Sequence, residues 1–593
     1  MENALEERYS KKAQELFSDE TFNSSEIIKE KEKFNSNIRK KKIRKEVFNK
    51  KNIYFKENKI NNSDLNNDIN IQNLNISPYL KEEKFIKDLI KDKNFDKIFE
   101  YIKEIYNNKN FNIDLVKFGL YCLNEKLLNI GNEEKNNIND NFGNIYNFRE
   151  IIYLLLIYSK EKRKKIDYEP IILKLTYKIL VNYCYYCTNN NFFLIDEKFI
   201  ELHLYFLEEI SDKNIIKNIL LMIYNLSLDN IKSTIKIFNF DNHKLFNILA
   251  DYINNYQNDI QRIEIILDIF LCYINIFNNY ENKIQSKNED IVEMKDNTID
   301  YNWEIIENIY YISIILIYNK QNTIFSNSIQ LISSIFRIIY KSKHFELIEK
   351  IINNIDTKTM ILLILEKKYQ ELPNDISYIS DIMKYILKSL SNFSTPKELK
   401  LKILDLINSV EQDLSENDGI IDIFIYLLID TKLNEKIIIK LLEVLFSLIK
   451  YEYFTKTIKE NYRDELFEII IKYINNSNYQ IRRKIFKIIG SVINKKDFVF
   501  ADYLIKNKIF YHIQKSINPN LTFCNDESII LSALKVIEVL LSIGEIFKKL
   551  HGVNTALLNF ENNGGKELLE NLLCNKSELV YNISLQIIDR YFN

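Results

Sequence analysis

The sequence predicts an all-α fold of stacked helices, and three observations support this prediction. Only 9 Gly and 5 Pro occur in 593 residues, whereas ordinary chains contain roughly 7% and 5%, and folds rich in tight turns need those residues. From Tyr79 onward, apolar residues recur at helical spacing between clusters of Asn, Asp and Lys. Similar segments also return at roughly 40 to 50 residues, a spacing that indicates internal repeats.

The clearest predicted helices are apolar on more than one face, so each is expected to pack on two sides. They fall at residues 83–92, 198–210, 262–277, 303–318, 436–451 and 527–543.

The repeat length indicates the type of array. Comparable segments reach Asn182, Asn225 and Asn275, which lie 43 and 50 residues apart, and such spacing with two or three helices per unit is typical of armadillo or HEAT arrays. We therefore predict a right-handed armadillo-repeat superhelical solenoid of about ten repeats over residues 79–593. Insertions are expected near 134–146 and 278–302, and the last repeat at about 561–593.

The N-terminal region differs from the array in charge. Residues 1–58 are predicted to form a basic helical arm, and the Asn-rich residues 59–78 a linker. Within the arm, Lys29–Lys51 carries a charge of +8, so the remainder of the chain carries −9, since the total is −1. A cationic arm on an anionic body can fold back onto that body or bind an acidic partner, which favours a binding protein.

The sequence offers little that could support catalysis or metal binding. The five His are dispersed, and Cys184 and Cys187 lie in an apolar helical segment, where two buried thiols are the expected outcome. No phosphate-binding loop, dinucleotide fingerprint or nucleophile elbow occurs. We expect no enzyme, no cofactor and no metal site.

The chain is also predicted to be soluble, with reduced thiols. Its first residues are charged throughout, which is unlike a secretory signal. The longest uncharged apolar run, 308–319, is shorter than the roughly 18 to 20 residues that span a bilayer.

Three features resemble one family, the importin alpha nuclear import adaptors. The arm sequence Asn23–Ile53 resembles the importin-beta-binding domain, with its basic cluster and distal K-R-R-N, here NKKN. The resemblance implies that importin beta binds the arm through Arg39, Lys40, Lys41, Lys42, Arg44, Lys45, Lys50 and Lys51.

The C-terminal segment Glu561–Phe592 resembles the last armadillo repeat of that family. The Gly564–Gly565 pair, Tyr581 and the ending Tyr591–Phe592 fall at matching spacing.

The third feature is the family's W-x-x-x-N pattern, in which Asn holds an extended cargo peptide and Trp flanks its lysines. Asp229 lies where the family pairs an aspartate with a cargo lysine, and the Trp slots hold other residues, Lys178 among them. The resemblance implies cargo-signal binding by Asn182, Leu221, Asn225, Asp229, Leu271, Asn275, Lys388 and Asn392. A minor site would use Glu443 with Ser447 and Lys487 with Ser491, whereas Trp303 matches no slot.

The function implied is that of a nuclear import adaptor, which binds lysine- and arginine-rich localisation signals in an acidic concave groove and shuttles between cytoplasm and nucleus. Its implied partners are importin beta, cargo proteins and a nuclear export receptor at the C-terminal repeats. The alternative is an armadillo scaffold or interaction protein with lost or altered cargo binding. Nucleic-acid binding by the arm is a distant third option, since the arm has few aromatic residues. Charge on all sides of residues 39–45 also argues against a membrane-surface helix.

Overall fold

The computed structural model describes most of the chain after residue 112. The described residues are 99, 102–103, 113–128, 145–163, 170–186, 191–229, 231–285, 302–319, 321–354, 357–361, 373–391, 395–413, 420–429, 433–450, 458, 461–476, 478–493, 498–517 and 526–592. They contain helices and no strand, so the all-α prediction is confirmed. They form two compact units, divided between Asn255 and Tyr256.

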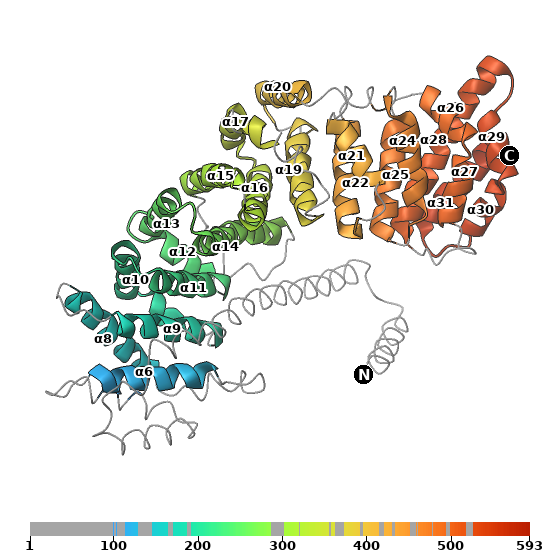
Figure 1. The fold of residues 1–593 in the computed structure, drawn as a ribbon. Helices are drawn as coiled ribbons and strands as arrows, with labels where there is room; N and C mark the ends of the chain where they lie inside the picture. Colours follow the sequence, from blue (N-terminus) through green and yellow to red (C-terminus); the bar gives the residue numbers. More distant parts are fainter. Residues whose placement is uncertain are drawn as a thin grey trace, which may run out of the picture. The chain divides into compact units, whose positions relative to one another are not determined.

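The first unit consists of short and medium-length helices. They are α6 (Ile113–Leu128), α8 (Ile145–Lys162), α9 (Ile171–Tyr186), the 3-10 helix η2 (Asn191–Ile195), α10 (Glu197–Glu209), α11 (Lys213–Asp229), α12 (Ile231–Asn239) and α13 (Lys244–Asn255). Helix α9 packs between α6 and α11, and we call these three helices the first ladder (Figure 1). Helices α8, α10 and α13 form a second layer, in which α10 contacts both of the others.

The second unit is longer and follows the same plan. Its first half contains α14 (Ile260–Gln285), α15 (Trp303–Ile317), α16 (Asn322–Ser342), α17 (Phe345–Asn353), α19 (Pro373–Ser391), α20 (Lys397–Asp413), α21 (Ile420–Ile429) and α22 (Glu435–Lys450). Its second half contains α24 (Arg463–Ile474), α25 (Tyr479–Ile493), α26 (Phe498–Lys506), α27 (Ile509–Ile517), α28 (Glu527–His551), α29 (Thr555–Asn562), α30 (Gly565–Leu572) and α31 (Glu578–Tyr591).

One row of helices runs through this second unit. In it α14, α16, α19, α22, α25, α28 and α31 each contact the next helix along the row, and we call them the second ladder (Figure 1). Helices α21, α24, α27 and α30 form a parallel second layer, each also packed on a ladder helix. The two ladders together hold ten helices among the described residues, which agrees with the expected number of repeats.

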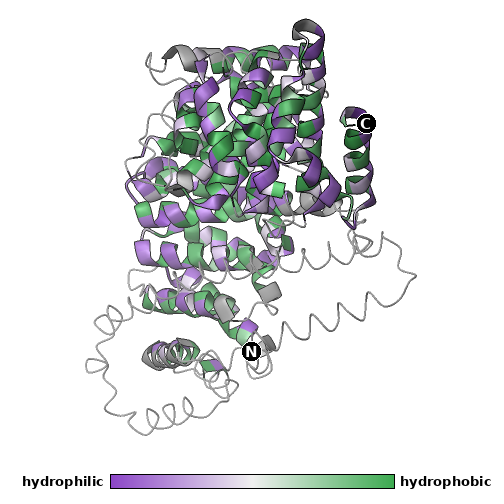
Figure 2. Ribbon diagram, turned by 90° about the vertical axis from the view of Figure 1, so that its right-hand side faces the viewer, coloured by the Kyte–Doolittle hydropathy of each residue, from purple (hydrophilic) through white to green (hydrophobic). Residues whose placement is uncertain are grey.

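The ladder helices stack because they are apolar on two sides, as the sequence predicts. In α22, Leu441, Leu442, Leu445, Leu448 and Ile449 are all fully buried. Such positions on both sides of the helix let it pack against α19, α25 and α21 at once. Figure 2 shows hydrophobic and hydrophilic residues alternating along the helices. Polar residues at helical spacing form a row along one face of a ladder helix, as Ser377, Asp381, Lys384 and Lys388 do on α19.

Residues of the Asn- and Asp-rich loops cap the N-termini of the helices that follow them. The Asn302, Asp526 and Asn554 side chains accept hydrogen bonds from the first backbone N–H groups of α15, α28 and α29. Such N-caps satisfy donors that a helix itself leaves unpaired. A chain poor in Gly and Pro can therefore still end and restart its helices sharply.

The C-terminal helices α29, α30 and α31 pack on one another as a three-helix unit that begins at Thr555. Gly564 adopts a left-handed backbone with φ of 80° between α29 and α30. A Cβ on Gly565 would lie 2.5 Å from the Phe560 ring, so the backbone approach there requires glycine. The glycine pair that suggests a family resemblance thus has a local structural role.

Two helix boundaries differ from those expected. Helix α14 continues to Gln285, so the first part of the predicted insertion 278–302 is helical. Helix α28 continues from the predicted end at 543 to His551, where Gly552 ends it in a left-handed conformation. The division at residue 255 was not among the predicted boundaries.

Candidate functional site

The polar rows of the second ladder bring charged residues together on three successive helices. On α19 the row contains Ser377, Asp381, Lys384 and Lys388, whose spacing places them on one helix face. Lys440 and Glu443 lie on the facing part of α22, and Lys484 on α25. We call Lys384, Lys388, Lys440 and Lys484, with Asp381 and Glu443, the lysine cluster.

Ion pairs connect the three helices across the cluster. The Asp381 carboxylate lies 2.6 Å from Lys384 Nζ and 2.5 Å from Lys440 Nζ. The Glu443 carboxylate lies 3.1 Å from Lys384 Nζ and 2.7 Å from Lys484 Nζ. Each carboxylate is therefore shared between two ammonium groups, and the cluster retains an excess of two positive charges.

Aromatic rings lie beside the lysines. Lys384 Nζ is 4.7 Å from the centre of the Tyr385 ring, and Lys388 Nζ is 5.9 Å from the same centre. Lys440 Nζ is 5.8 Å from the Tyr378 ring centre. The tyrosine faces add weak attraction for the cations and cover their aliphatic stems.

The pKa directions follow from burial and from these neighbours. Burial lowers the pKa of Lys384, but Asp381, Tyr385 and Glu443 outweigh it and hold the pKa above its ordinary value. Burial would raise the pKa of Glu443, yet Lys384 and Lys484 hold it low. For Lys388, burial, Lys384 and Lys484 lower the pKa and outweigh the two carboxylates. Burial is the largest cause of the lowered pKa of Lys388, and the two neighbouring lysines add to it.

The predicted cargo-binding asparagines of the first ladder make contacts inside the protein. The Asn182 Nδ2 group, fully buried on α9, donates to Asn124 Oδ1 on α6 at 2.9 Å. The Asn225 Nδ2 group on α11 donates to the Val181 carbonyl on α9 at 3.3 Å. Leu221 is also buried, at 1% exposure. These side chains connect neighbouring helices, so Asn182 and Leu221 are not surface groups that a peptide could reach.

The other predicted cargo-binding positions lie in different surroundings. Asp229 is the last residue of α11, and Leu271 on α14 is buried. Asn275, one turn beyond Leu271, is exposed on the same helix. Lys388 belongs to the lysine cluster, while Asn392 lies just outside the described residues.

The remaining predicted binding residues are those of the minor cargo site and those of the N-terminal arm. Ser447 donates to the Glu443 carbonyl of its own helix at 2.8 Å, and the Glu443 carboxylate is held by lysines. Lys487 is exposed on α25. All eight residues predicted to bind importin beta lie in residues 39–51, outside the described residues.

Of the lysine cluster, sequence reasoning singled out only Lys388 and Glu443, and it did not place them in one site. The expected groove was acidic, and this part of the second ladder is instead cationic. The available signal was a Lys on each of three successive ladder helices, namely 384, 440 and 484.

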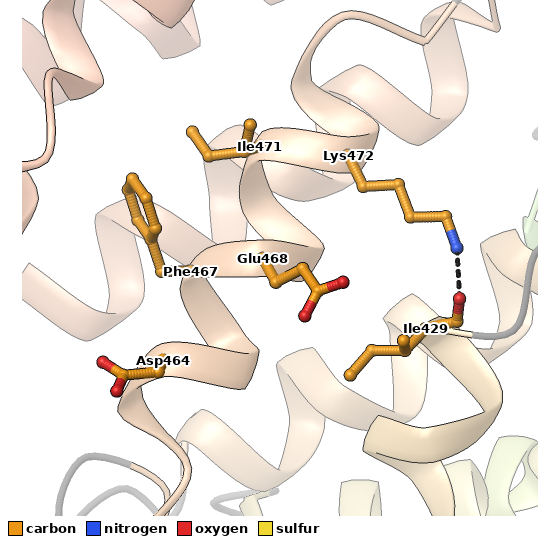
Figure 3. A pocket seen from close by; sticks show the side chains of 6 residues that line it. All are labelled: Ile429, Asp464, Phe467, Glu468, Ile471 and Lys472. Carbon is orange, nitrogen blue, oxygen red and sulfur yellow. Dashed lines mark hydrogen bonds between the residues drawn. The ribbon is translucent and has the colours of Figure 1, made fainter.

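A shallow hollow of about 550 Å³ lies beside α24 in the second layer (Figure 3). Lys472 Nζ on its rim donates to the Ile429 carbonyl at 2.6 Å and so caps the end of α21. The Tyr503 hydroxyl donates to Asp464 at 2.6 Å. Burial and this bond raise the pKa of Tyr503 to about 12, so the phenol stays protonated at neutral pH. Both hydrogen bonds join α24 to another helix.

The described residues contain no group of three or more His, Cys, Asp or Glu that could hold a metal ion. Within the same part of the chain, no helix has the length and apolar character that crossing a membrane requires. The lysine cluster joins three helices of the described part of the chain through three ion pairs between helices.

The stacked ladders, their second layers and three-helix units such as α29–α31 define a helical-repeat solenoid protein of the armadillo type. No family model matches the chain, and no curated protein matches it. The chain is similar to one in a solved structure concerning a conserved phosphorylation switch that controls the interaction between cadherin and beta-catenin. That match has a TM-score of 0.39 and 10% sequence identity, and it covers 83% of this chain and 90% of the other. A likeness at this level carries no functional argument.

Proposed function

We propose that this protein is an interaction scaffold: a helical-repeat solenoid that docks partner proteins on the polar rows of its ladder helices and acts by binding rather than by catalysis. The observation that supports this most is the lysine cluster, in which charged groups from α19, α22 and α25 converge on one face.

A ladder suits this role because each of its helices contributes a short row to one long surface. A partner segment lying across α19, α22 and α25 would meet several repeats at once. The fold keeps those rows in place through the buried apolar sides of the same helices, such as Leu441 and Leu445 of α22. Binding therefore needs no rearrangement of the core.

Site-specific photo-crosslinking of the full chain in living cells tests the scaffold proposal. A benzoylphenylalanine at Lys487, which is exposed on ladder helix α25, is expected to crosslink to partner proteins. The matched control is the same residue at Tyr426, which is 58% exposed on the second-layer helix α21. Equal crosslinking from both positions, or crosslinking from Tyr426 alone, would contradict docking on the ladder.

The second candidate is the nuclear import adaptor. Its support is the resemblance of Asn23–Ile53 and Glu561–Phe592 to importin alpha, together with the exposure of Asn275 on α14. The buried Asn182 and the cationic lysine cluster weigh against binding of a basic cargo signal along the whole array. The scaffold is therefore the better supported of the two.

Titration of a fluorescent lysine-rich peptide and of importin beta with the full chain separates the candidates. An adaptor should bind both, should lose the peptide on Asp229→Lys, and should lose importin beta when residues 39–45 are neutralised. It should also be found in both cytoplasm and nucleus, and it should bind the peptide more tightly once residues 1–58 are removed. Absence of binding to both ligands would eliminate the adaptor and leave the scaffold.

A further inference from the structure

The lysine cluster has a charge that its own carboxylates do not balance. Four ammonium groups face two carboxylates, and each carboxylate is already shared by two lysines. Arg337 on α16 lies close enough to Tyr385 to act on its ionisation, which extends the positive region to a fourth ladder helix. The residues of this region give a net positive charge on α16, α19 and α25, and the Lys440 and Glu443 charges of α22 cancel.

The cluster is only partly open to water. The Lys384 side chain is 9% exposed, and those of Lys440 and Lys484 are 29% and 23% exposed. Charges in such positions are screened less by solvent and salt than charges on fully exposed lysines. An anion that reaches these lysines therefore gains more electrostatic binding free energy than it would at a fully exposed lysine-rich surface.

From this charge balance we infer that the lysine cluster binds an acidic segment of a partner protein, lying in an extended conformation across α19, α22 and α25. This inference rests on the proposed scaffold function and gives the chemical nature of one partner. The shared ion pairs support it, because Asp381 and Glu443 are each already divided between two lysines and a further carboxylate would stabilise the ammonium groups.

The geometry of the ladder sets the spacing of the acidic residues. Packed helices lie roughly 8–10 Å apart. A polyproline-type extended peptide has three residues per turn and rises about 3.1 Å per residue, so positions i and i+3 point the same way about 9.3 Å apart. Acidic residues at every third position would therefore meet successive ladder helices.

A peptide fits this cluster better than a nucleic acid does. Asp381 and Glu443 lie among the lysines, with Glu443 between Lys384 and Lys484. A continuous phosphate backbone would place negative charge against these carboxylates, whereas a peptide can place neutral residues there. The Tyr378 and Tyr385 rings offer apolar contact for those intervening residues.

Fluorescence anisotropy with the full chain tests the inference. The probe is a labelled nonapeptide, Glu-Ser-Pro repeated three times, at low salt. We expect saturable binding that weakens as salt rises, and at least a tenfold loss of affinity in Lys388→Gln and in Lys484→Gln. Lys402→Gln is the matched control: Lys402 on α20 pairs with Glu349 on α17, 2.5 Å away and outside the ladder, and its loss should leave affinity unchanged.

Three outcomes would overturn the inference: no binding of the Glu-Ser-Pro peptide, equal affinity in all variants, or tighter binding of a single-stranded oligonucleotide through the same lysines. Circular dichroism melting shows whether each variant is folded. If Lys484→Gln is not folded, the Lys388→Gln result decides, since the four ion pairs of the cluster are made by Lys384, Lys440 and Lys484. If the peptide does not bind but crosslinking from Lys487 is observed, the acidic-segment inference fails and the scaffold proposal stands. If the peptide binds but no crosslinking from Lys487 is observed, docking of partner proteins on the ladder in cells is refuted.

Discussion

Different side-chain chemistry joins neighbouring helices within each of the two ladders. In the first ladder neutral amides join neighbouring helices, as Asn182 does with Asn124 and Asn225 with the Val181 carbonyl. Across α19, α22 and α25 of the second ladder charged groups do so, as Lys384 does with Glu443. A neutral amide whose N–H group already donates inside the protein has little hydrogen-bonding capacity left for a ligand. Shared ion pairs with surplus lysines hold helices together, so under the proposed function the same type of repeat would serve structure in one unit and binding in the other.

The largest effect should come from removing a carboxylate of the lysine cluster. Glu443→Leu takes away one of two anions among four ammonium groups, and we expect a loss of about 3 kcal/mol, because uncompensated charge in a partly buried site is costly. Hydrogen exchange of amides in α19, α22 and α25 measures the free energy of opening.

An exposed pair provides the control for this change. Glu349 and Lys402 have side chains 45% and 40% exposed. Glu349→Leu should cost less than about 1 kcal/mol, because solvent screens such pairs. Similar losses for both variants would show that the cluster is no more than a surface network.

A change of pH should weaken the first unit selectively. Burial lowers the pKa of His203 to about 3, and the imidazole accepts or shares a hydrogen bond with the Tyr177 hydroxyl at 3.0 Å. The folded state favours the neutral ring, so its stability is complete above the unfolded pKa of about 6.5 and is lost as pH falls toward 3. Lowering pH from 7 to 5 should cost about 2 kcal/mol.

The difference between wild type and His203→Gln isolates this contribution. Glutamine can still hydrogen-bond to Tyr177 but does not titrate, so the variant should lose about 2 kcal/mol less over the same pH range. Hydrogen exchange of amides in α9 and α10 measures it. An equal pH dependence in both proteins would refute a buried neutral His203.

A smaller loss is expected from the amide bridge of the first ladder. Asn182→Leu leaves the buried Asn124 oxygen without its donor, and we expect a loss of about 1.5 kcal/mol by urea unfolding. The double variant Asn124→Leu with Asn182→Leu should recover part of that loss, because neither polar partner remains. Additive losses in the double variant would show that the two amides are not coupled.

The smallest effect should follow substitution of the exposed Asn275 on α14. Asn275→Ala is expected to change stability by less than about 0.5 kcal/mol, as is usual at exposed positions. A thermal melt beside that of Asn182→Leu makes the comparison. A loss of the same size as for Asn182→Leu would show that both asparagines serve the fold.

The fold could be predicted well from the sequence, because its signals are local. The apolar pattern over residues 436–451 locates α22, and the Asn and Asp residues mark helix starts such as Asn302. Helix ends were less certain: nothing local separates the end of α14 at Gln285 from the polar residues that follow. The division between two units depends on contacts between distant residues, which a repeat pattern does not reveal.

The site was harder to predict because a residue's role depends on its neighbours in space. Asn182, Asn225 and Asn275 look alike in sequence, yet the first is fully buried and the last is exposed. The lysines of α19, α22 and α25 appear as ordinary helix-surface charges until the helices are stacked. Only the stacking shows that two carboxylates serve several lysines.

Stacking in a row has a mechanical consequence. Each helix of the second ladder contacts mainly the next one along, so a pull on the ends of this unit passes through its repeats in series. We expect such a unit to stretch like a spring, sharing a small extension among many interfaces before any helix detaches. A force–extension curve with a single abrupt rupture would contradict this elasticity.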